Sequence, residues 1–171
     1  VLHVVSATLG GGGVSDLVVS MGGLHLAIMP GVGDGSCGPG EVVMATQDSV
    51  TCAVADFDGD GHDDVAALQY APAAVHVLLG QPGPALALAS SVTLPAKAAW
   101  PRTTDADHDG DIDLVLSSYE LGALIVLENV GDGSFLVHAT LPHGLSSTDM
   151  DMGDLDADGA PDVVLATSDG A

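Results

Sequence analysis

The sequence VADFDGDGHDDVAAL, residues 54–68, places five aspartates between two runs of apolar residues that favour β-strands. Gly59 and Gly61 separate three of these aspartates, and glycine and aspartate are among the residues that most readily form tight turns. The stretch therefore predicts two strands joined by a short loop with a concentrated negative charge.

The same loop occurs three times at a constant spacing. DFDGDGHDD spans residues 56–64, DADHDGDID spans 105–113 and DLDADGAPD spans 154–162, so the loops begin 49 residues apart. A fourth, degenerate copy, TLGGGGVSD at 8–16, retains only the final aspartate, Asp16. Repetition at a period of about 40–50 residues indicates a fold built from one repeated unit of secondary structure.

Each repeat contains sequence for four short strands separated by turn residues. VTCAVADF leads into the 56–64 loop, and DVAALQY, AVHVLLG and ALALASSV follow it. Many of these runs are apolar nearly throughout, as expected for strands that are buried between stacked sheets. Four strands in a repeat of this length predict an all-β fold, namely a β-propeller segment of about three and a half four-stranded blades.

We expect a single partial β-propeller over residues 1–171, in which the aspartate-rich loops join the first and second strands of a blade. The expected blades cover about residues 1–47, 48–95 and 96–145, and a half-blade covers 146–171. Because a propeller closes with about 4–8 blades, we also expect an open sheet edge that further strands would pair.

The regular spacing of carboxylates within each loop predicts a site for a hard cation. With the first aspartate as position 1, carboxylates occupy positions 1, 3, 5 and 9, and position 6 is a glycine whose positive φ would turn the chain around a small ion. An anionic, flexible set of oxygen ligands favours Ca²⁺, so three calcium ions are expected. The predicted ligands are the side chains of Asp56, Asp58, Asp60, Asp64, Asp105, Asp107, Asp109, Asp113, Asp154, Asp156, Asp158 and Asp162, and the backbone carbonyls of His62, Asp111 and Ala160 at position 7.

A solvated acidic turn is the alternative interpretation of each loop. Carboxylates about 4 Å apart repel by roughly 1 kcal/mol per pair even in water, and three copies in the same register argue against turns without a cation. An EF-hand is a second alternative, but it needs flanking helices and a bidentate glutamate at position 12. The chain has strand sequence around the loops, and Ala67, Leu116 and Leu165 stand at that position.

These motifs resemble the FG-GAP/VCBS repeat, found in the propellers of integrin α-subunits and in many secreted bacterial and algal proteins. The resemblance rests on the D-x-D-G-D-G-x-x-D loop, on the strand after it and on the GDGSF turn at 131–135, whose counterpart in the first blade is GDGSC at 33–37. The second blade departs from the pattern with GQPGPAL at 80–86. The resemblance implies calcium sites, an extracellular location, and binding or adhesion more often than catalysis.

Composition narrows the classes of partner. The 171 residues include 24 acidic and two basic residues, for a net charge of −22 at pH 7. This charge opposes binding to nucleic acid or to an anionic membrane. No apolar run approaches the roughly 18 residues of a transmembrane helix.

The leading hypothesis is a non-catalytic, calcium-binding module that serves protein binding, adhesion or scaffolding in a secreted or cell-surface protein. The alternative is a structural subunit of an extracellular filament or oligomer, in which another chain or segment completes the propeller. A hydrolase or a lectin on this scaffold has weaker support, because the dense acid clusters are assigned to the calcium loops and aromatic residues make up only 3% of the chain. A glycan remains a candidate ligand beside protein partners.

The two cysteines, Cys37 and Cys52, would link adjacent blades if they formed a disulfide, which an oxidising compartment would permit. Two buried thiols that pack as small apolar residues are the alternative. The sequence leaves both interpretations open. The seven histidines have no zinc-binding spacing and are interpreted as structural or surface residues.

Overall fold

The computed structural model describes residues 3–11, 13–21, 25–45 and 50–168, which form 14 strands and one short 3₁₀ turn, η1 Leu9–Gly11. The first sheet contains β1 His3–Ala7, β2 Asp16–Met21, β3 His25–Met29 and β4 Glu41–Ala45, and the second contains β5 Val50–Ala55, β6 Asp64–Gln69, β7 Ala74–Gln81 and β8 Ala85–Thr93. The third contains β9 Ala99–Thr104, β10 Asp113–Ser118, β11 Ala123–Asn129 and β12 Phe135–Pro142, and the two-stranded fourth contains β13 Ser147–Gly153 and β14 Asp162–Thr167. Within these residues, no helix has the length and apolarity needed to cross a membrane.

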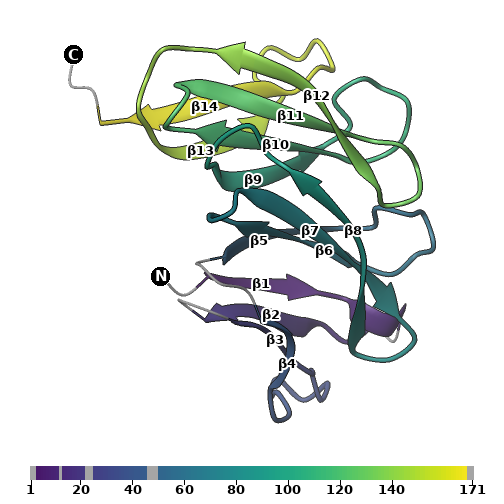
Figure 1. The fold of residues 1–171 in the computed structure, drawn as a ribbon. Helices are drawn as coiled ribbons and strands as arrows, with labels where there is room; N and C mark the ends of the chain where they lie inside the picture. The colour runs from purple at the N-terminus through teal and green to yellow at the C-terminus, as the bar shows by residue number, and fades with distance from the viewer. Residues whose placement is uncertain (1–2, 12, 22–24, 46–49, 169–171) are drawn as a thin grey trace.

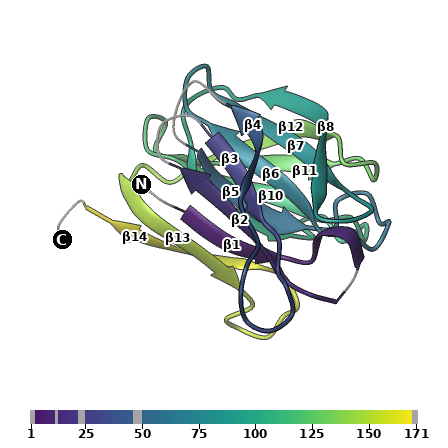
Figure 2. The same ribbon diagram turned by 90° about the horizontal axis from the view of Figure 1, so that it is seen from below.

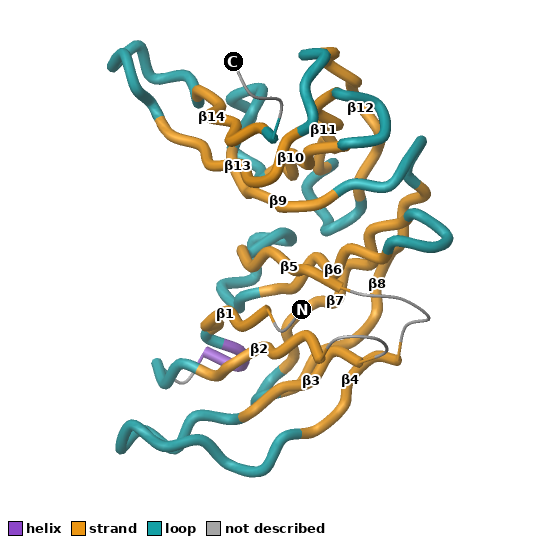
Figure 3. Tube along the Cα trace, turned by 90° about the vertical axis from the view of Figure 1, so that its left-hand side faces the viewer, coloured by secondary structure: helices purple, strands orange, loops and turns teal. Residues whose placement is uncertain are grey.

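The four sheets are stacked in chain order from the N-terminal sheet to the C-terminal one (Figure 1). Every sheet is antiparallel, and its strands are ordered as in the sequence. β5 contacts both β1 and β9, and β13 contacts β9, so the first strands of the sheets lie along one side of the stack (Figure 3). The view from below shows the sheets overlying one another (Figure 2). This arrangement is a partial β-propeller of three blades and a half-blade, as predicted.

The core lies between the blades, and β6 shows why its sequence is apolar throughout. Successive side chains of a strand point to opposite faces. Val65 and Ala67 therefore pack in the cluster shared with the first blade, whereas Ala66 and Leu68 pack in the cluster shared with the third. A sheet buried on both faces has no position for alternating polar residues, which explains the continuous apolar runs.

The fourth strand of a blade is the most exposed, because it lies at the outer edge of the stack. Leu88 on β8 is 61% exposed and Leu136 on β12 is 60% exposed. Phe135, at the start of β12, is an exception because its ring packs edge-on against Phe57 in the core between the second and third blades, with 5.3 Å between ring centroids.

The structure contains no disulfide between Cys37 and Cys52, which are both free thiols. Cys37 lies exposed in the connection between β3 and β4, whereas the Cys52 side chain is buried in the core between the first two blades. Burial raises the pKa of the Cys52 thiol to about 12, so it behaves as a small apolar side chain. The disulfide interpretation is therefore wrong, and of the alternative only the burial of Cys52 is confirmed.

Replacing a core leucine on β10 tests this account of the packing. Leu116 is fully buried between the second and third blades, so Leu116→Ala should lower the free energy of unfolding by about 2–5 kcal/mol. The matched variant Leu136→Ala, at an exposed leucine of β12, should change it by less than about 0.5 kcal/mol. Denaturant unfolding measures both, and equal losses would contradict the assignment of the core.

Candidate metal centres

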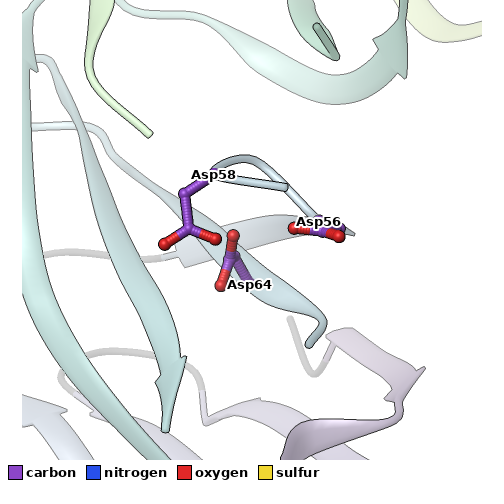
Figure 4. Close-up of side chains that lie close together, drawn as sticks. All are labelled: Asp56, Asp58 and Asp64. Carbon is purple, nitrogen blue, oxygen red and sulfur yellow. The ribbon is translucent and has the colours of Figure 1, made fainter. Parts of the chain in front are cut away.

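Three aspartates of each loop bring their carboxylates together. The groups consist of positions 1, 3 and 9, and within each group one oxygen per residue lies within 4.8 Å of the others. Figure 4 shows the first group, in which Asp56 and Asp58 lie on the loop and Asp64 begins β6. The groups are Asp56, Asp58 and Asp64; Asp105, Asp107 and Asp113; and Asp154, Asp156 and Asp162.

The first aspartate folds the loop around itself. Asp56 Oδ1 accepts the N–H groups of Gly59 at 2.8 Å and Asp60 at 3.2 Å, and its Oδ2 accepts that of Gly61 at 2.9 Å. Position 6 has a positive φ in all three loops, as predicted. Position 4 is also left-handed, even where it is His108 or Ala157, with φ of 65° and 63°. The loops therefore hold two residues of unusual conformation, of which the sequence indicated one.

The carboxylate at position 5 of each loop accepts a backbone N–H from within the loop. Asp60 Oδ1 accepts the N–H of His62 at 2.8 Å, and Asp109 and Asp158 make the same contact with the residue at position 7. These three side chains lie outside the groups formed by positions 1, 3 and 9. Their role as ligands, and that of the carbonyls of His62, Asp111 and Ala160, remains a prediction.

The aspartate at position 9 holds the loop to the rest of its blade. Asp64 is fully buried; its Oδ2 accepts the N–H of Phe57 and its Oδ1 accepts that of Gly80, both at 2.7 Å. Asp113 makes the same two contacts, with Ala106 and Asn129, each at 2.8 Å. One carboxylate thus joins the start of the loop to the end of the third strand.

Asp16 shows that this contact does not depend on the other aspartates. It is buried in the first blade, and its Oδ1 accepts the N–H of Gly31 at 2.8 Å. The contact explains why the last aspartate survives in the degenerate copy.

Gly10 explains why that copy cannot carry an aspartate at position 3. A Cβ at Gly10 would lie 2.5 Å from the backbone nitrogen of Gly83, in the turn between β7 and β8. The approach of the second blade therefore excludes a carboxylate side chain there, which supports three metal centres rather than four.

The charge of the loops is not balanced by basic side chains. Lys97 pairs with Glu120, and Arg102 pairs with Asp149 and Asp151, all outside the loops. In the 105–113 loop, Asp105 Oδ1 is buried and has no hydrogen-bond partner in the described structure. A cation would supply the missing partner and reduce the repulsion between the carboxylates.

The oxygen separations suit calcium. Calcium binds oxygen at about 2.3–2.6 Å, so one ion spans ligands up to about 5 Å apart. Magnesium, which binds at about 2.0–2.1 Å in strict octahedral geometry, suits a loop with three clustered carboxylates less well. The residues present thus fit a calcium ion in each loop.

Burial raises the pKa of two of the aspartates at position 9, Asp64 and Asp113. Desolvation, with a smaller contribution from the charges of Asp58 and Asp56, raises the pKa of Asp64 to about 6 despite the two N–H donors. The pKa of Asp113 is raised for the same reasons, with Asp107 and Asp109 as the neighbouring charges. In the absence of a cation, the 56–64 and 105–113 loops therefore each hold a carboxylate that resists ionisation.

The two histidines within the loops differ. His108 is exposed and its Nε2 lies 3.4 Å from the carbonyl oxygen of Gly159, in the next loop. His62 is half-buried, and its Nδ1 has no hydrogen-bond partner within the described residues. Of the two, only His108 is therefore a surface residue.

Comparison with protein families identifies the repeat. The FG-GAP-like repeat family matches residues 56–116 and 105–165, which together cover well over half of the chain. The chain therefore belongs to the FG-GAP-like repeat family, as its motifs predicted.

Two solved structures with a similar fold come from proteins of different kinds, a lectin and a toxin pore. An Agrocybe aegerita lectin, described for specific recognition of non-reducing terminal N-acetylglucosamine, aligns with a TM-score of 0.64 and 22% identity over 94% of this chain and 45% of the lectin chain. The Photorhabdus luminescens Tc holotoxin pore aligns with a TM-score of 0.52 and 20% identity over 97% of this chain and 8% of its own. The chain thus spans less than half the length of either. Comparison with curated proteins gave no match.

The raised pKa of Asp64 predicts how the calcium-free protein responds to pH. The folded state, with a pKa of about 6, binds this proton more tightly than the unfolded state, with a pKa near 3.8. Ionised Asp64 should therefore lower the free energy of unfolding above pH 6, by on the order of 1–3 kcal/mol, and the loss should disappear as the pH falls toward 4. Carboxyl ¹³C NMR in a chelator should place the Asp64 midpoint near 6, and a midpoint near 4 would contradict the prediction.

Proposed function

We propose that the chain is a calcium-stabilised β-propeller module, without catalytic activity, that serves protein binding, adhesion or scaffolding in an extracellular protein. The observation that carries the proposal is the convergence of three carboxylates in each of three loops that contain no basic partner. Calcium at these loops would lock the connection between the first two strands of a blade, so that metal binding and folding are linked.

The proposal of a non-catalytic role rests on the contacts that the aspartates of the loops make. The aspartates of the loops accept backbone N–H groups and form the metal groups, which leaves no pair of them free for acid–base chemistry. Extracellular modules commonly bind calcium with dissociation constants of about 10⁻⁴–10⁻³ M, so an extracellular location would keep these loops occupied. A glycan is the alternative ligand to a protein, since the Agrocybe lectin with this fold recognises a sugar.

Calcium removal tests the proposal. The chain should bind three calcium ions, and at a calcium concentration about 100 times the dissociation constant each ion should add about 2.7 kcal/mol to the free energy of unfolding. Calorimetry should show three ions, and EGTA should lower the melting temperature.

Matched variants make this test specific to the loops. Asp107→Ala should remove one ion, whereas Asp132→Ala, at an exposed aspartate of the GDGSF turn, should remove none. An unchanged melting temperature in EGTA would overturn the calcium proposal.

The half-blade supports a second candidate function, that of a structural subunit completed by further strands. An apolar groove of about 370 Å³ lies between the third blade and the half-blade, and Leu124, Leu141 and Val163 contribute to its lining. Within the described residues Asp162 accepts one N–H, from Leu155, whereas Asp64 and Asp113 each accept a second one from a third strand. The half-blade therefore offers a pairing edge, an apolar wall and an acceptor for a third strand.

Self-association tests this second candidate. Sedimentation of the chain in calcium should show oligomers if a second copy covers the groove. Leu141→Glu, at a half-exposed leucine of the groove, should dissociate them, whereas Leu88→Glu, at an exposed leucine of the second blade, should not. A monomer at all concentrations would contradict completion by a second copy.

A further inference from the structure

The single asparagine of the chain, Asn129, connects two of the metal centres. It ends β11 in the third blade and is only 1% exposed. Its side-chain Nδ2 donates to the carbonyl oxygens of Phe57 at 2.8 Å and Ile112 at 3.1 Å, and its Oδ1 accepts the N–H of Gly131 at 3.1 Å. The side chain therefore has a partner at both ends and is held in one orientation.

The contact with Phe57 reaches the 56–64 loop. Phe57 stands between Asp56 and Asp58, and its N–H holds Oδ2 of Asp64, so it adjoins all three carboxylates of that centre. The ring of Phe57 packs edge-on against Phe135 of the third blade. The third blade thus holds both the backbone and the side chain of this residue.

The backbone of Asn129 reaches the 105–113 loop. Its N–H donates to Oδ1 of Asp113 at 2.8 Å, and Asp113 is the buried carboxylate of the second centre. One rigid residue is therefore in contact with a ligand of the second centre and with the backbone between two ligands of the first.

This connection is specific to the centres of the 56–64 and 105–113 loops, which belong to the second and third blades. The residues that correspond to Asn129 in the first and second blades are Gly31 and Gly80, which donate their N–H in the same way but have no side chain to reach another blade. The third centre touches the second through the exposed contact between His108 and Gly159.

We propose that Asn129 is a positioning residue that couples calcium binding at the 56–64 loop to calcium binding at the 105–113 loop. This inference rests on the proposed calcium function. An ion bound in either loop restrains the residue that Asn129 contacts there, Phe57 or Asp113, and Asn129 transmits this restraint to the other loop. The second ion then binds a site whose ordering cost has been partly met. The coupling is reciprocal, and it does not extend from the 56–64 loop to the 154–162 loop.

The coupling can be measured in the full chain by removing one loop at a time. Asp58, Asp107 and Asp156 occupy position 3 of their loops, and each accepts the N–H of the residue at position 5 of the same loop. Alanine at each should therefore disable one centre with little other effect. Calcium titration of Asp156→Ala gives the overall constant for the first two centres. The same titration of Asp107→Ala/Asp156→Ala and of Asp58→Ala/Asp156→Ala gives their separate constants. The overall constant should exceed the product of the separate ones at least 5-fold, a typical allosteric coupling factor.

Two controls assign the coupling to Asn129. In the Asp107→Ala background, the first and third centres should bind independently, with a coupling factor near 1. Asn129→Gly copies the residue of the second blade and keeps the N–H to Asp113, so it should reduce the factor for the first two centres to near 1 while both ions still bind. If this variant does not fold, Asn129→Ala, which keeps the backbone N–H and has no side-chain donor for Phe57, serves the same purpose.

The outcomes separate this inference from the calcium proposal. A coupling factor of 1 in the chain with Asn129, or an unchanged factor in the folded Asn129 variants, would overturn the role of Asn129 and leave calcium binding intact. If no calcium binds to the chain, the calcium proposal and this inference are overturned together.

Discussion

The hydrogen bonds that the carboxylate of a loop's last aspartate accepts are the interactions on which the rest of a blade depends. In the second and third blades it accepts one N–H from the start of the loop and one from the end of the third strand. These bonds are buried, where an unpaired N–H or carboxylate would cost several kcal/mol. Asp16 keeps the contact with the third strand in a loop that lacks the other aspartates. This carboxylate therefore has a structural role even in a loop that forms no group of three carboxylates.

Stacking of the blades turns this local contact into a connected set of sites. The second sheet buries both faces in apolar contact, and the contact between His108 and Gly159 places the 105–113 loop beside the 154–162 loop. Each of the last three sheets thus carries a group of three carboxylates. A bound cation would compensate this charge, since the two basic residues of the chain are paired elsewhere.

Several features of the fold and the site were predictable because they depend on residues close together in the sequence. The 49-residue period, the apolar strands and the glycine at position 6 led to the blades and to the loop conformation. Other features were not. The left-handed conformation of His108 and Ala157 contradicts their ordinary preference, and the hydrogen bond from the His62 N–H to Asp60 had no signal in the sequence. The sequence marks Asn129 only as the single asparagine of the chain, and this by itself suggested no role for it.

The sequence by itself determined what each repeat does locally: four strands, a nine-residue loop and carboxylates turned toward one centre. Bonds that span two to seven residues follow from spacing, as those of Asp56 and Asp64 with their own loop do. Only the tertiary structure decided which blades touch and where. The bond from Asn129 to Phe57 joins residues 72 positions apart, and the clash that excludes a side chain at Gly10 comes from Gly83 in the next blade. Such contacts depend on the distance and alignment of stacked sheets, which no single repeat specifies.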